Sequence, residues 1–406
     1  MSVMPARESM TPIDPRARLK SADAVRGFAL FGFLLVNMFN FGAYSPEWTE
    51  PVDRIFASLM HFIFETKSLR LFALLFGFGF ALQWAKHVDP GAGKFWFYYR
   101  RLAILFVFGM MHALFFDGDI LMEYALLGCF LPFFSRLRTG VLLALAVLLL
   151  AVFPIGNLVE SLQGGGSSWD PEESMTLVQL RAGHPYLGSL QDVFEENAAV
   201  IPPRIWTKLN GPESSLTIFA MFLLGLSIGR SRIVHDAGSH AAGIGKLFRW
   251  CAVVGVIFGL LEWLLQRQFG YAVFEGSSAA VPMQLLGDLL FAYGSTALAL
   301  AYGSGIVLLA QRPAWNPVLQ PFQALGKMAL TVYLSGTAMA TLLFYGYGFG
   351  QLYLLGPAAT TAYALMFFAV QAGFCSWWLA RYRFGPMEWL WRSLSYMKWQ
   401  PLRIAA

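Results

Sequence analysis

Ten apolar segments, each near the length that a helix needs to cross a bilayer, dominate this sequence. A spanning helix needs about 20 mainly apolar residues, and the candidates are residues 23–41, 69–84, 102–116, 120–134, 141–158, 216–229, 251–265, 285–309, 329–347 and 352–379. Lipid offers no hydrogen bonds to backbone N–H and C=O groups, so each segment should be helical, because a helix pairs these groups internally. Only 13% of the 406 residues are charged, against about 25% in soluble domains. The sequence therefore predicts an all-α, polytopic membrane helix bundle.

The basic residues orient this bundle. With ten spans, most of the 29 lysines and arginines fall on the same side as the N-terminus, and that side is cytoplasmic under the positive-inside rule. We therefore predict that both termini are cytoplasmic. The basic residues follow this topology and form no nucleic-acid-binding patch. The three cysteines form no CxxC pair, and we expect no metal site.

The same pattern divides the chain. We expect a disordered cytoplasmic tail (1–20), membrane helices (21–158), an extracytoplasmic loop (159–213), further membrane helices (214–380) and a cytoplasmic tail (381–406). A loop as long as the third segment is usually a lid over a site or disordered. We expect it to contain a short amphipathic helix near residues 187–198.

Ionisable residues gather where an FDGD sequence separates two apolar runs. His112 precedes this break, Asp117 and Asp119 lie in it, and Glu123 follows it. The topology places the break on the outer side. At the same depth lie further polar residues, namely Asn37, Lys67, Arg70, Glu262 and Asp288. Ionisable groups within a membrane usually face a cavity or one another, so we predict a shared polar cavity. The alternative is that each side chain snorkels separately at a span end.

His112 is the best candidate for a catalytic group. A neutral imidazole can accept a proton near pH 7, and Asp117 or Asp119 could orient the ring. The alternative is a histidine that bonds across helices for packing. Asp119 and Glu123 are four residues apart and could share a proton, although Asp119 could instead complement a helix dipole.

Other polar residues are predicted to bind substrate or a donor. Asn37, Lys67, Arg70 and Glu123 are the candidates for substrate binding at the outer side. On the inner side, Asp23 and Arg26 are the candidates for donor binding. Arg26 could hold a phosphate or only anchor the span, and Asp23 could simply stabilise a helix N-terminus.

Several segments resemble a known family. They are SADAVRGFALFGFLLVNM at 21–38, KSLRLFALLFGFGF at 67–80, RRLAILFVFGMMHALFFDGDILMEYALLG at 100–128, GKMALTVYLSG at 326–336 and FGPMEWLWRSLSYMKWQPLR at 384–403. In them the chain resembles the YeiB-like family of bacterial multi-pass membrane proteins, a domain of unknown function (418). This resemblance implies a bacterial inner membrane. Thr66 stands where we expect a glycine, which argues against close approach of a ligand to that backbone.

The DAVRG motif that begins at Asp23 is similar to the start of membrane-bound acyltransferases such as the lysosomal heparan acetyltransferase. This similarity implies acyl transfer from a cytoplasmic donor, acyl-CoA or another acyl carrier, to a small-molecule or glycan acceptor outside. The alternative is a transporter or channel for a small solute or ion. In that case Asp119, Glu123, Lys67 and Arg70 would bind cargo or protons. A third hypothesis is an assembly partner without turnover.

Overall fold

The structure, a computed structural model, describes residues 19–42, 50–86, 92–162, 177–210, 215–231, 233–234, 236–274 and 281–404. These residues are mostly helical, and within them the β-structure is one isolated bridge between Tyr382 and Arg403. The prediction of an all-α bundle is confirmed. The N-terminal tail expected at 1–20 lies almost wholly outside the described residues.

The described residues form a succession of helices. In chain order they are α1 (Lys20–Gly42), α2 (Pro51–Leu59), the π-helix η2 (Met60–Phe64), α3 (Lys67–Lys86), α4 (Ala92–Ala113), α5 (Leu121–Gly128), α6 (Leu131–Phe134), α7 (Thr139–Leu162), α8 (Leu177–Arg181), η4 (Pro185–Leu187), α9 (Leu190–Asn210), α10 (Ser215–Arg230), α11 (Ala241–Phe274), α12 (Val281–Leu309), η5 (Pro313–Trp315), α13 (Asn316–Lys327), α14 (Ala329–Phe344), α15 (Pro357–Leu379) and α16 (Pro386–Tyr396).

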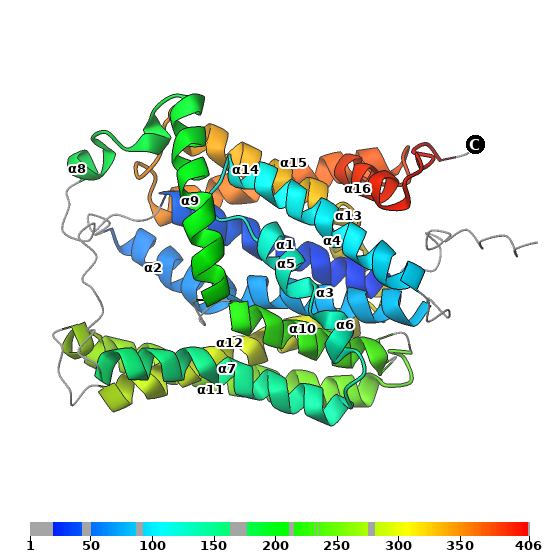
Figure 1. The fold of residues 1–406 in the computed structure, drawn as a ribbon. Helices are drawn as coiled ribbons and strands as arrows, with labels where there is room; N and C mark the ends of the chain where they lie inside the picture. Colours follow the sequence, from blue (N-terminus) through cyan, green and yellow to red (C-terminus); the bar gives the residue numbers. More distant parts are fainter. Residues whose placement is uncertain are drawn as a thin grey trace, which may run out of the picture.

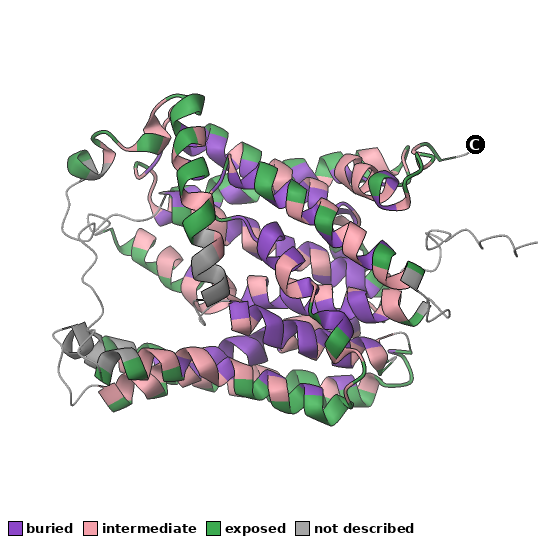
Figure 2. Ribbon diagram, viewed as in Figure 1, coloured by how far each residue is buried: buried purple, intermediate pink, exposed green. Residues whose placement is uncertain are grey.

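Most of the long helices run along one axis of the bundle (Figure 1). α8 and α9 lie at one end, with α9 standing across the others, and α16 lies at the opposite end with the C-terminus. α1 and α3 run through the interior, where buried residues are concentrated (Figure 2). The helix expected near 187–198 is present within η4 and α9. The segment expected as a C-terminal tail folds in part as α16.

Six described helices or helix runs are long and apolar enough to cross a membrane. They are Lys20–Phe41, Pro51–Ala85, Thr139–Val159, Ala241–Leu265, Val281–Leu309 and Pro357–Leu379. The pair formed by Pro313–Lys327 and Ala329–Phe344 also qualifies, but it is bent by 88°. The chain is thus a multi-pass membrane protein, and the count of ten spans stays a prediction.

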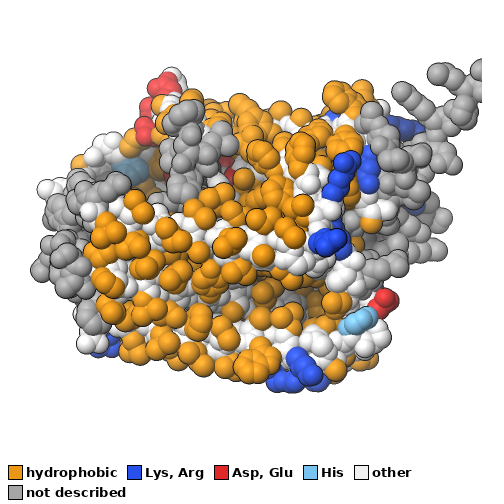
Figure 3. Space-filling model, turned by 60° about the horizontal axis from the view of Figure 1, so that its bottom comes forward, with side chains coloured by type: hydrophobic (Ala, Val, Ile, Leu, Met, Phe, Trp, Pro, Cys, Tyr) orange, Lys and Arg blue, Asp and Glu red, His pale blue; other side chains and the backbone are white. Residues whose placement is uncertain are grey.

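The outer face of α7 and α11 is suited to lipid. Hydrophobic side chains cover this face, and lysines and arginines gather mainly toward the end that carries the C-terminus (Figure 3). Only 22% of the apolar stretch of α7 and 11% of that of α11 is buried within the protein. Helices that are apolar all round and exposed in the fold need lipid or other protein to cover them.

The span expected at 120–134 is interrupted. α5 has 8 residues and α6 has 4, which at ~1.5 Å per residue is too short to cross a bilayer as one helix. The hydroxyls of Tyr98 and Tyr99 donate to the carbonyls of Gly128 and Cys129. These bonds satisfy backbone groups that the break leaves free.

Glycines let the central helices approach closely. A Cβ on Gly77 of α3 would lie 2.0 Å from the carbonyl oxygen of Phe222 in α10. In the reverse direction, a Cβ on Gly225 would lie 1.9 Å from the carbonyl oxygen of Leu74. Gly32 of α1 packs in the same manner against Ser68 of α3. Small residues at helix crossings are typical of membrane bundles.

Candidate functional site

His112 and Asp119 form a buried pair at the hairpin between α4 and α5. His112 Nδ1 lies 2.8 Å from Asp119 Oδ2, and the two side chains are 4% and 1% exposed. The other carboxylate oxygen, Oδ1, accepts a hydrogen bond from the backbone N–H of Met122, 2.9 Å away. Asp119 therefore both stabilises the start of α5 and fixes the ring of His112.

The opposite nitrogen of His112 is available for chemistry. His112 Nε2 is buried and has no hydrogen-bond partner among the described residues. The ring packs against Tyr333 of α14, with centroids 4.8 Å apart. With Nδ1–H donated to Asp119, Nε2 of a neutral ring is an acceptor. An acceptor of this kind can take a proton from a hydroxyl or an amine.

A pocket between α1, α14 and α15 adjoins this pair. Its lining includes Asn37, Phe41, Tyr333, Thr337 and Gln371. Tyr333 contacts the ring of His112, and Phe41 contacts Phe116, which packs against the same ring. Asn37 thus lies in a pocket that is linked to the ring of His112 through Tyr333 and Phe41.

The remaining carboxylates of the hairpin have different surroundings. Glu123 is buried, and its Oε1 accepts a hydrogen bond of 2.7 Å from the Ser215 hydroxyl of α10. Asp117 is half-buried at the turn. Of the two carboxylates expected to orient His112, the structure brings Asp119 to the ring. Asp119 and Glu123 accept hydrogen bonds from different groups, so each carboxylate has its own donors.

Lys67 and Arg70 lie in a separate polar cluster. We define the His61 cluster as His61, Glu65, Lys67, Arg70 and Glu262. Lys67 Nζ donates to the carbonyl of His61 at 2.8 Å. Arg70 donates to the carbonyl of Ala292 and to Thr296 Oγ1 on α12. The pocket beside this cluster is lined by η2, α3, α11 and α12 and shares no lining residue with the pocket near His112.

The outer polar residues therefore do not line one common pocket in the described part of the chain. The close packing of Gly32 on Ser68 brings α1 against α3. That these residues share one depth in the membrane stays a prediction, and the sequence could not tell on which side of α1 and α3 each of them lies.

Backbone strain marks the start of α3. Thr66 has a φ of 57°, a left-handed conformation that is unusual for a β-branched residue. It follows the π-helix η2, and π-helical turns are often found at functional sites. The glycine expected at this position would adopt such a φ without strain.

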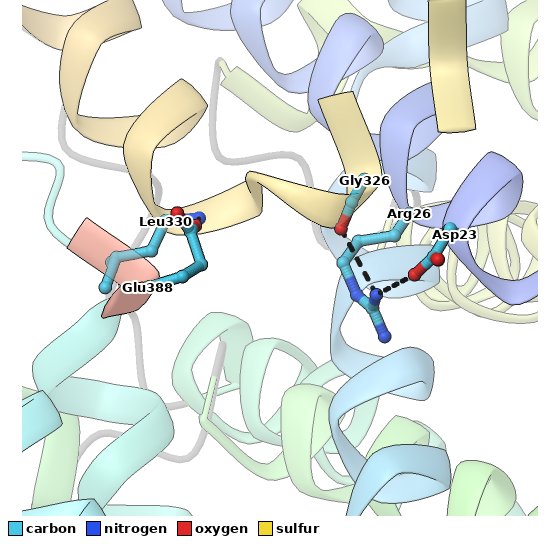
Figure 4. Close-up of polar contacts among 5 residues, drawn as sticks. All are labelled: Asp23, Arg26, Gly326, Leu330 and Glu388. Carbon is cyan, nitrogen blue, oxygen red and sulfur yellow. Dashed lines mark hydrogen bonds and ion pairs between the residues drawn. The ribbon is translucent and has the colours of Figure 1, made fainter. Parts of the chain in front are cut away.

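On the inner side, Asp23 and Arg26 meet the break between α13 and α14. Arg26 Nη1 donates to Asp23 Oδ1 at 2.9 Å and to the carbonyl of Gly326 at 3.3 Å (Figure 4). The side chain of Arg26 is 28% exposed, whereas that of Asp23 is 6% exposed. Asp23 Oδ2 is buried without a hydrogen-bond partner in the described regions. The partly exposed guanidinium could contact a phosphate.

Glu388 of α16 supports the same break from the other side (Figure 4). Its Oε1 accepts hydrogen bonds from the N–H groups of Leu330 and Thr331, at 2.5 and 3.0 Å. Its Oε2 accepts one from the Thr331 hydroxyl at 2.6 Å. A carboxylate at a helix N-terminus compensates both the bare N–H groups and the dipole. Burial raises the pKa of Glu388, and these hydrogen bonds oppose that rise.

The sequence interpretation missed three of these residues. His61 stands four residues before Glu65, a helical spacing that could have paired them. Tyr333 and Glu388 lie inside the family-like segments, but no spacing linked them to His112 or to α14. Contacts between segments that are distant in the chain are not visible in the periodicity of one segment.

Comparisons with known proteins give a consistent result. The family described as "Protein of unknown function (DUF418)" matches residues 228–398. "Uncharacterized protein YxaH" of Bacillus subtilis (strain 168) is 33% identical, with 97% of this chain and 98% of the relative aligned. "Uncharacterized protein YeiB" of Escherichia coli (strain K12) is 29% identical over 92% of this chain and 95% of the relative. No solved structure matches significantly.

Proposed function

This chain belongs to the DUF418 family, as its resemblance to YeiB-like proteins indicated, and we propose that it transfers an acyl group across the bacterial inner membrane. The donor is cytoplasmic and the acceptor is on the outer side. The observation that carries this proposal is the buried His112–Asp119 pair. Its second ring nitrogen has no partner among the described residues, and its ring packs against Tyr333, which lines a pocket.

His112 acts as the general base. Its Nε2 takes the proton from an acceptor hydroxyl or amine as that group attacks the acyl carbonyl carbon. The bond between the acceptor and the acyl carbon forms, the bond from the acyl carbon to the donor sulfur or oxygen breaks, and the proton passes to the leaving group. Asp119 holds Nδ1–H and stabilises the imidazolium during the transfer. Asn37 orients the substrate in the adjoining pocket.

Arg26 and Asp23 bind the donor at the inner end of α1. Arg26 is partly exposed and supplies a guanidinium for a phosphate of the donor. Asn37 lies eleven residues further along α1, which is about 16 Å of helix. A donor that binds at Arg26 must therefore carry its acyl group on a long flexible arm, as acyl-CoA does.

Release of free thiol tests this proposal. Purified protein in lipid nanodiscs is incubated with acetyl-CoA and a panel of hydroxyl- and amino-sugars, and free CoA is measured. We expect thiol release that depends on an acceptor and is lost in His112→Gln. Arg26→Gln should raise KM for the donor more than it lowers kcat. A protein that neither binds nor consumes an acyl donor would overturn the proposal.

Solute transport is the second candidate, because the His61 cluster buries Lys67, Arg70 and Glu262 beside a pocket separate from that of the proposed catalytic pair. A transporter would move its cargo in proteoliposomes without consuming an acyl donor. Uptake that is abolished by Glu262→Gln but does not require His112 would favour transport over catalysis.

A further inference from the structure

The His61 cluster has the geometry of a proton relay. His61 Nδ1 lies 2.6 Å from Glu65 Oε2, and His61 Nε2 lies 3.7 Å from Glu262 Oε2. Each ring nitrogen of this histidine therefore faces a carboxylate. An imidazole can donate at both nitrogens only when it is protonated, and a neutral ring donates at one and accepts at the other. This arrangement allows a proton to enter at one nitrogen and leave at the other.

Exposure falls steadily along the three side chains. The side chain of Glu65 is 46% exposed, that of His61 is 33% exposed, and that of Glu262 is 4% exposed. Glu65 can exchange protons with the medium, whereas Glu262 is enclosed between helices. The three residues thus connect the surface to a buried carboxylate.

One oxygen of the buried Glu262 carboxylate lacks a hydrogen-bond donor among the described residues. Its Oε1 is buried and accepts no hydrogen bond from the described residues. It lines a pocket with His61, Lys67, Gly255, Gly259 and Ser295, among others. An ionised carboxylate with a bare oxygen at this depth is strongly disfavoured. A proton on Glu262 removes the charge and with it most of this cost.

The neighbouring charged groups make contacts of their own. Lys67 donates to the carbonyl of His61, and Arg70 donates to α12. Both cations lie over the ring of Phe291, at 5.3 and 5.7 Å from its centroid. On α12, Asp288 accepts a hydrogen bond of 2.9 Å from Asn157 of α7. On α11 itself, Arg267 stacks on Trp263. Lys67 and Asp288 also interact electrostatically with Glu262. Among the described residues, the ion-pair partner of Glu262 is His61.

We propose that Glu65, His61 and Glu262 carry a proton from the outer solution to the pocket between α11 and α12. His61 gives its Nε2 proton to Glu262 and accepts one at Nδ1 from Glu65, which then takes a proton from water. The net result is one proton moved from the medium to Glu262. Glu65 is restored, and His61 is again neutral but carries its proton on Nδ1, so a flip of the ring or proton exchange with water returns that proton to Nε2 before the next transfer. A water molecule or a small movement closes the 3.7 Å gap. This activity is separate from acyl transfer at His112.

Labelling with dicyclohexylcarbodiimide tests the relay, because this reagent modifies protonated carboxylic acids. Right-side-out membrane vesicles that contain the full chain are prepared with independently set inner and outer pH. They are labelled briefly, and the modified peptides are quantified by mass spectrometry. We expect labelling of Glu262 to rise several-fold as the outer pH falls and to be independent of the inner pH. No labelling of Glu262 at any pH, or labelling that follows the inner pH, would overturn the proposal.

Two variants separate the relay from a passive ion pair. His61→Gln should abolish most of the response of Glu262 labelling to outer pH, and Glu65→Gln, at a half-exposed position that tolerates change, should do the same. Glu123 is a buried carboxylate that bonds Ser215 outside this cluster, and its labelling in the same digest serves as the internal reference. A Glu262 response that is unchanged in both variants would contradict the relay.

Discussion

His112 depends on Asp119 for its orientation, and Asp119 in turn depends on the start of α5. The sequence placed both residues at one break between apolar runs, and either neighbouring carboxylate could have been the partner. The structure brings Oδ2 of Asp119 to Nδ1 of His112 and bonds Oδ1 to the backbone N–H of Met122. The choice between Asp117 and Asp119 depends on the path of the turn, which residue spacing does not define.

Asp119→Asn should lower kcat for acyl transfer by roughly 10²- to 10⁴-fold, because the amide stabilises the imidazolium poorly and permits the wrong tautomer. The measurement is thiol release from acetyl-CoA at saturating donor. Asp53→Asn is the matched control, since Asp53 also accepts a hydrogen bond from a backbone N–H at the start of a helix, that of Ala358 in α15, and has no assigned role in the site. Equal losses in the two variants would mean that Asp119 acts through folding alone.

Thr66→Gly should raise stability by about 1 kcal/mol, because it removes strain from a left-handed β-branched residue and costs only some chain entropy. The thermal unfolding midpoint in detergent reports this change. The same substitution at Thr217, in the first turn of α10, should instead destabilise by about 0.3–0.5 kcal/mol. If both substitutions destabilise alike, Thr66 stores no strain.

At the scale of elements, the sequence predicted where the helices lie, but it did not predict where they break or bend. Each of the ten apolar segments lies largely in helical residues, because hydrophobic length is a local property. The break between α5 and α6 and the 88° bend before α14 were not predicted. Hydrogen bonds with distant residues stabilise both. The Tyr98 hydroxyl donates to the carbonyl of Gly128, and Glu388 accepts from the N–H of Leu330 at the start of α14.

Gly225→Ala should destabilise the crossing of α3 and α10 by about 1–3 kcal/mol, because a Cβ there meets the carbonyl oxygen of Leu74 at 1.9 Å. Gly79→Ala, in α3 but with nothing within 4 Å of its Cβ, should stabilise by ~0.5–1 kcal/mol. Thermal unfolding of the two variants in one detergent provides the comparison. The unfolding midpoint should fall in Gly225→Ala and rise in Gly79→Ala. A change in the same direction in both variants would refute this description of the packing.

Glu388 should make stability depend on pH. Burial raises its pKa in the folded protein above the unfolded value. The free energy of unfolding that protonated Glu388 contributes is therefore fully present below the pKa of Glu388 in the unfolded protein. It is lost as pH rises through the pKa of Glu388 in the folded protein. Glu388→Gln cannot ionise, so its stability relative to the wild type should increase from acid to neutral pH. Unfolding in detergent across this pH range is the measurement, and parallel curves for the two proteins at all pH values would contradict this assignment.

The whole molecule has a lipid-facing side and two chemically different ends. Composition and charge predicted a multi-pass helical membrane protein, and that prediction is confirmed. The orientation and the count of ten spans remain predictions, since they depend on how the membrane lies along the bundle. The division of the outer polar residues into the His112 pair and the His61 cluster could not be predicted, because it follows from the packing of α1 on α3.

Transfer across a sealed membrane is the most direct test of the proposed acyl transfer. Oriented vesicles are given radiolabelled acetyl-CoA on the cytoplasmic side and an impermeant acceptor sugar on the other side, and acylated sugar is measured in the second compartment. We predict product there with the wild-type protein and none with His112→Gln. Absence of product with a well-folded wild-type protein, or equal product with both proteins, would contradict acyl transfer by this site.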